Sequence, residues 1–245
     1  MLRSRRLDSG DAAVASGAGG TAASVTPIEA VGWGVLGLLG GALMGQLSLL
    51  LERPLKDEDP PPKLGAGLLE LVLLPLLGFV GFAAFALRQG MGPGLLVHSL
   101  WIVVLLQILG FDLKHRLVLD VITLPTIGLA LALSNLSPDL SVLRALLGIL
   151  LGGALMLPFA IVSEIFHNGE GFGWGDVKLA MMIGAITGMS LNYGQLYTVW
   201  ALIAGSVIGG VITIILLVTR RVHLHDALPY GPYLVAGAGL ILYFM

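Results

Sequence analysis

Cysteine is absent from this sequence, and charged side chains are scarce. Because none of the 245 residues is Cys, the chain can form no disulfide, use no thiol nucleophile and bind no zinc through thiolates. Only 11% of the residues are charged, and the formal net charge is -2. Binding to nucleic-acid phosphates requires concentrated Lys and Arg, so nucleic acid is not expected as a partner. Nothing in the sequence predicts a metal site or a cofactor.

Apolar residues and glycine dominate instead. Hydrophobic residues make up 56% of the chain, with 35 glycines, far from the usage of soluble domains. Runs of about 18 or more apolar residues recur, each long enough to cross a roughly 30 Å hydrocarbon core as a helix. We therefore predict an all-α, polytopic membrane bundle of about eight transmembrane helices in the lipid bilayer. The expected spans are about 31–51, 67–87, 92–110, 117–134, 143–166, 177–191, 195–218 and 228–244.

The segment before the first span has a different composition. Residues 1–28 are mostly small and polar, with Arg3, Arg5 and Arg6 near the start, and contain too few large apolar groups to fold alone. We expect a disordered tail there, followed by a single membrane-embedded domain over 29–245. The longest expected loop, 52–63, is charged and rich in proline, as is typical of a solvated linker.

Lys and Arg divide unevenly between the two sides of an eight-span bundle. The side that carries the tail holds fewer of them than the other side, which contains Arg53, Lys56, Lys63, Lys114, Arg116, Lys178, Arg220 and Arg221. By the positive-inside rule the richer side faces the cytoplasm. The ends of the third and fifth spans, with Asp112 and Asp176, are therefore expected at the cytoplasmic face.

Residues 169–178, Gly-Glu-Gly-Phe-Gly-Trp-Gly-Asp-Val-Lys, place a carboxylate behind four alternating glycines at the start of an apolar helix. An ionisable group at the edge of hydrocarbon is costly and suggests function. The alternative is that Asp176 is a helix N-cap. An N-cap does not explain the run of glycines, which lets another chain approach closely.

Asp112 is the second candidate carboxylate. The alternative for it is local pairing with Lys114 or Arg116 at the membrane boundary, and such surface pairs contribute little. Two carboxylates held close together cannot both ionise easily. One can then deprotonate a water molecule while the other, protonated, polarises a peptide carbonyl. Spacing assigns neither role to either Asp.

Three motifs resemble a known family. Gly173-Trp174-Gly175-Asp176 is similar to the GxGD motif of membrane aspartyl proteases, in particular the type IV prepilin leader peptidases. In that family an earlier Asp is followed by a Pro-Asp pair and a Thr, and here Asp112 is followed by Leu119-Asp120 and Thr123. Residues 229–232, Pro-Tyr-Gly-Pro, resemble the third signature. The resemblance covers roughly residues 90–245.

The resemblance implies roles for particular residues. Asp112 and Asp176 would be the catalytic dyad, and Gly173 and Gly175 would leave room for an extended substrate backbone. Lys178 would orient Asp176 or bind a carbonyl, or would be a boundary lysine. Supporting roles, or alternatively plain helix contacts, are implied for Asp120 and Thr123. Glu170 and Lys114 are candidates for substrate binding, in which Glu170 would attract the basic leader or, alternatively, be a plain loop residue.

The implied activity is that of an aspartic-type endopeptidase in the bacterial inner membrane. It would cut the basic leader from type IV prepilins or pseudopilins at the cytoplasmic face, where their hydrophobic helix begins, in pilus assembly or protein secretion. Many family members also N-methylate the product and carry a zinc-binding insert with paired cysteines. This chain has no Cys, so cleavage without methylation is predicted.

Two other classes of function stay open at this point. One is a transporter or channel in which Asp112, Asp120, Glu164 and Asp176 relay protons or cations. The clustering of these carboxylates at one face and the lack of an internal repeat argue against it. The other is an inactive scaffold of the secretion machinery. Glu70 and His98 are interpreted as helix contacts in either case.

Overall fold

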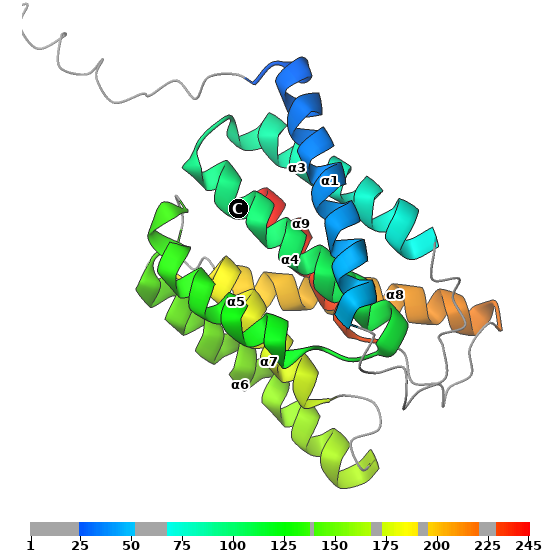
Figure 1. The fold of residues 1–245 in the computed structure, drawn as a ribbon. Coiled ribbons are helices and arrows are strands. Elements are labelled where there is room, and N and C mark those ends of the chain that lie inside the picture. The colour runs from blue at the N-terminus through cyan, green and yellow to red at the C-terminus, as the bar shows by residue number, and fades with distance from the viewer. Residues whose placement is uncertain (1–24, 52–67, 138–139, 168–172, 191–195, 221–228) are drawn as a thin grey trace, which may run out of the picture.

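A computed structural model describes residues 25–51, 68–137, 140–167, 173–190, 196–220 and 229–245 (Figure 1). These ranges are almost entirely helical and contain no strand. The predicted tail falls largely outside the described residues, and the predicted 52–63 linker and Glu170 fall wholly outside them. The all-α prediction is confirmed.

In the part of the chain that the structure describes, eight helices lie close to the predicted spans. Their bounds are α1 Pro27–Leu51, α3 Leu74–Gln89 continuing a π-helical turn η2 Leu69–Leu73, α4 Pro93–His115, α5 Asp120–Leu133 with a 3-10 turn η3 Ser134–Leu136, α6 Val142–His167, α7 Trp174–Thr187, α8 Tyr197–Val218 and α9 Gly231–Phe244. Within the described residues, five are long and apolar enough to cross a membrane: α1, η2 with α3, α4, α6 and α8. Two further helices, α5 with η3 and α9, are apolar but shorter.

Two helices depart most from the predicted spans. One is α4, which continues to His115, five residues past the expected end at 110, so that Asp112 lies inside the helix. The other is α7. It covers Trp174–Thr187, about three residues earlier at each end than the expected 177–191. Gly173 precedes its first turn with extended backbone, and Gly188 ends it at φ 69°, a left-handed value that favours glycine. Glycines at both ends therefore define a helix of 14 residues.

Three helix pairs, α1 with α3, α6 with α7 and α8 with α9, make the closest packing in the molecule. Glycines form the contacts: a side chain on Gly37 would overlap the backbone of Gly78, and one on Gly148 would overlap that of Gly184. Apolar helices in lipid gain little from hydrophobic burial against each other, so close backbone approach at small residues holds them together. In Figure 1, α4 and α9 lie between the α1 and α3 pair and the group of α5, α6 and α7.

The Gly148 and Gly184 contact gives a stability prediction. Gly184→Ala places a Cβ against the backbone of α6, and such overpacking costs roughly 1–3 kcal/mol. We expect a lower unfolding midpoint in detergent, measured by circular dichroism. Gly128→Ala in α5 is the matched control, because nothing lies within 4 Å of a Cβ at that position. An unchanged midpoint for Gly184→Ala would contradict the packing argument.

Candidate active site

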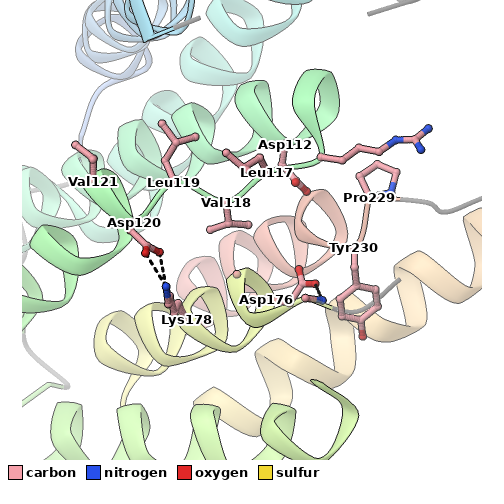
Figure 2. A pocket seen from close by; sticks show the side chains of 13 residues that line it. Asp112, Leu117, Val118, Leu119, Asp120, Val121, Asp176, Lys178, Pro229 and Tyr230 are labelled. Atoms are coloured by element: carbon pink, nitrogen blue, oxygen red, sulfur yellow. Dashed lines mark hydrogen bonds and ion pairs between the residues drawn. The ribbon is translucent and has the colours of Figure 1, made fainter. Parts of the chain in front are cut away.

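A cavity of about 610 Å³ lies where the end of α4 meets the starts of α5, α7 and α9. Asp112 and Asp176 both face into it (Figure 2). Residues 116–119 connect α4 to α5 beside the cavity, Gly173 precedes α7 there, and Pro229 and Tyr230 precede α9. The cavity is lined by Asp112, Arg116, Leu117, Val118, Leu119, Asp120, Val121, Gly173, Gly175, Asp176, Lys178, Pro229 and Tyr230.

Asp112 sits in the last turn of α4 and is almost fully buried, with 4% of its surface exposed. The helix ends just beyond it because Arg116 adopts a left-handed conformation, with φ 52°, and donates its backbone N–H to Asp112 O at 2.8 Å. The start of α9 packs directly on this carboxyl, since a Cβ on Gly231 would overlap Asp112 Oδ2. The end of α4 and the start of α9 thus enclose this side chain.

Asp176 is the third residue of α7, so it is not the N-cap that the sequence suggested as an alternative. The cap position is Gly173, whose backbone N–H donates to Asp176 Oδ2 at 3.1 Å. Asp176 precedes the apolar part of α7. Burial raises the pKa of this carboxyl to about 6, and the hydrogen bond from Gly173 partly offsets that rise.

This pKa predicts how stability changes with pH. The folded-state pKa of about 6 is above the ordinary 3.8, so the folded protein binds the Asp176 proton more tightly than the unfolded chain. That contribution to stability is complete at low pH and is lost as pH rises through 6. We expect Asp176→Asn, which has no such proton, to gain stability relative to the unmodified protein between pH 4 and 7, as measured by thermal unfolding. A constant difference would contradict the burial argument.

Lys178 and Asp120 form an ion pair across the cavity. Lys178 Nζ donates to the two carboxylate oxygens of Asp120 at 2.6 and 2.8 Å (Figure 2). The two side chains are 37% and 51% exposed, so the pair adds little stability. It connects the first turn of α5 to the second turn of α7, and its position favours interaction with a molecule in the cavity.

Other predicted site residues lie elsewhere. Thr123 is fully buried and donates its hydroxyl to Leu119 O at 3.2 Å, and it does not line the cavity. Lys114 does not line the cavity and forms a buried ion pair with Glu70 of η2. The expectation that Glu70 makes a helix contact is therefore confirmed, whereas the position of Lys114 does not suit substrate binding in this cavity.

Sequence reasoning gave no role to several lining residues. Val118 lies beside Gly175, where an added Cβ would come within 3.1 Å of Val118 Cβ. Tyr230 borders the cavity next to Asp176 (Figure 2). The Pro-Tyr-Gly-Pro motif pointed to Tyr230, but nothing in the local sequence pointed to Val118.

The arrangement suits hydrolysis. Two carboxylates from separate helices face one open cavity, so a water molecule between them would contact a base and an acid. Among the described residues, no group of three or more His, Asp or Glu is placed to hold a metal ion.

The region around this cavity matches a known family. A profile of the type IV leader peptidase family matches residues 99–244, more than half of the chain. The chain belongs to the type IV leader peptidase family. Both aspartates and all three motifs lie inside the matched range. The resemblance drawn from those motifs is thereby confirmed.

Relatives in the type IV leader peptidase family carry the name prepilin leader peptidase/N-methyltransferase. The protein from Pseudomonas aeruginosa is 28% identical over 54% of this chain and 43% of its own length. The Aeromonas hydrophila protein is 29% identical over 69% and 57%, and that of Xanthomonas campestris pv. campestris is 31% identical over 62% and 50%. The chain thus spans about half the length of these relatives. No solved structure matches it.

Proposed function

We propose that this family member is an intramembrane aspartyl endopeptidase that removes the leader peptide of type IV prepilins or pseudopilins. The observation that carries the proposal is the convergence of Asp112 of α4 and Asp176 of α7 on one cavity. The family match and the names of the relatives support the substrate class.

The chemistry requires one ionised and one protonated carboxyl. The ionised Asp takes a proton from water, whose oxygen attacks the peptide carbonyl carbon, while the protonated Asp donates to the carbonyl oxygen. The tetrahedral intermediate then collapses, the C–N bond breaks, and the leaving nitrogen takes up a proton. No covalent acyl intermediate forms. Burial of both side chains makes a shared proton favourable, because two adjacent charges in a poorly solvated site repel.

The cavity carries groups of both charge signs, which suits the polar leader of a substrate. Its lining holds three carboxylates, Asp112, Asp120 and Asp176, against two cations, Arg116 and Lys178. The substrate must present an extended backbone, because the amides of an intact helix are already hydrogen bonded. Gly173 and Gly175 leave space for it at the first turn of α7.

We propose that the cavity faces the cytoplasm in the bacterial inner membrane. The excess of Lys and Arg on that side of the bundle supports this orientation. We further propose that residues 29–245 form one membrane-embedded domain that follows a disordered tail over residues 1–28.

The transporter alternative gains no support from the site. It needs a chain of carboxylates through the bundle, but Asp112, Asp120 and Asp176 gather at one cavity at the helix ends. Glu164 is exposed on α6 and does not line that cavity.

Co-expression with a prepilin whose leader ends in Gly tests the proposal. We expect a shortened product whose new N-terminus has an unmodified amine, read by mass spectrometry of the intact product. An uncut prepilin would overturn the peptidase assignment. A mass gain of one methyl group would overturn only the prediction of cleavage without methylation.

A further inference from the structure

A second, apolar groove opens between α6 and α8. It has a volume of about 440 Å³, and all of its lining side chains except Ser206 are apolar. Large side chains at the groove are exposed, with Phe159 at 61%, Val207 at 59% and Ile203 at 46%. Both walls belong to candidate membrane spans. The lining residues are Leu155, Met156, Phe159, Val199, Leu202, Ile203, Ser206 and Val207.

One hydrogen bond joins this groove to the catalytic cavity. Ser206 Oγ in the groove lies 2.5 Å from the hydroxyl of Tyr230, which lines the catalytic cavity. Because the Ser206 hydroxyl donates to Leu202 O at 2.8 Å, the Tyr230 hydroxyl is the donor to Ser206. In Figure 2, Tyr230 stands between Asp176 and α8. The groove and the cavity therefore share a wall.

We infer that the groove between α6 and α8 binds the substrate's apolar helix just beyond the cleaved bond, while the polar leader occupies the catalytic cavity. This inference rests on the proposed function. The substrate of a leader peptidase is polar before the cut site and apolar after it. The protein surface changes in the same way, from the polar cavity on one side of Tyr230 to the apolar groove on the other. In lipid, close packing of one face of the substrate helix into the groove, rather than hydrophobic burial, would hold the helix there and keep the cut site near Asp176.

Filling the groove with a bulky side chain tests the inference. The variants are Ile203→Trp on α8 and Leu155→Trp on α6, both in the groove. Their matched controls are Ile214→Trp and Leu150→Trp, exposed positions on the same helices that do not line it. Two substrates are compared: a full prepilin in proteoliposomes, and a soluble peptide with the leader, the cut site and a few polar residues.

We expect the groove variants to lower kcat/KM for the prepilin at least about tenfold, chiefly through KM, and to cut the peptide within about twofold of the unmodified protein. The controls are expected to cut both substrates normally. Normal cleavage of the prepilin by both groove variants would overturn the inference and leave the proposed function intact. If the unmodified protein cuts neither substrate, the proposed function fails and this inference with it.

Photo-crosslinking gives a second readout that does not use the Trp variants and stays informative if those variants fold poorly. A benzophenone amino acid replaces Val207 in the groove or, as a control, Ile214, in otherwise unmodified protein. We expect a prepilin adduct at 207, mapped to its apolar helix, and none at 214. Adducts with lipid alone at 207 would overturn the inference, because the groove would then be a site for acyl chains.

Discussion

We expect the replacement of Asp112 or Asp176 with Asn to abolish the proposed leader removal, with a loss of at least about a thousandfold in rate. Asn has nearly the shape of Asp but can neither accept the proton of water nor donate one to a carbonyl as a carboxylic acid does. Each variant leaves one carboxyl of the dyad, which cannot act as acid and base in the same step. Trimming of prepilin, followed by electrophoresis and mass spectrometry, measures the loss.

Asp120→Asn is the matched control, because Asp120 lines the same cavity but pairs with Lys178. We expect it to retain most of the activity. All three variants should insert into the membrane like the unmodified protein and, at or below about pH 4 where Asp176 is protonated in both states, should unfold like it, which excludes misfolding as the cause. Trimming at the wild-type rate by Asp112→Asn or by Asp176→Asn would contradict the aspartyl mechanism. An equal loss of trimming in all three variants would mean that activity depends on the charge of the cavity and not on the dyad in particular.

Gly231→Ala has the second large expected effect. Gly231 is the first residue of α9, and a Cβ there would overlap Asp112 Oδ2. Either the carboxyl or the start of α9 must move, and displacing a catalytic group by about 1 Å can cost a hundredfold in rate. We expect trimming to fall by about that factor, measured as kcat for prepilin.

Gly239→Ala in the same helix is the control, since nothing lies within 4 Å of a Cβ at that position. Both variants replace a helical glycine with alanine, so they share any gain in helix propensity. Activity that falls in Gly231→Ala but not in Gly239→Ala locates the effect at Asp112. Equal, normal activity in both would show that α9 does not constrain the dyad.

Much of the fold follows from local sequence. Long apolar runs predict the eight helices because a helix satisfies its own backbone hydrogen bonds in lipid. The start of α7 is predicted at Val177 because the apolar run begins there. The helix begins three residues earlier, after Gly173, whose backbone is extended and whose N–H donates to the side chain of Asp176. Backbone hydrogen bonds, which a count of apolar residues does not register, set that boundary.

The sequence by itself determined the membrane helices and singled out Asp112 and Asp176, because the GxGD spacing and a second Asp at a span end are local features. Only the tertiary structure decided which side chains pair with one another. Lys114 pairs with Glu70, 44 residues away, and Lys178 with Asp120, 58 residues away. Which side chains meet depends on how glycine contacts set the distance and rotation of packed helices, and no local pattern encodes that geometry. The same packing places Gly231 on Asp112 and joins Tyr230 to Ser206.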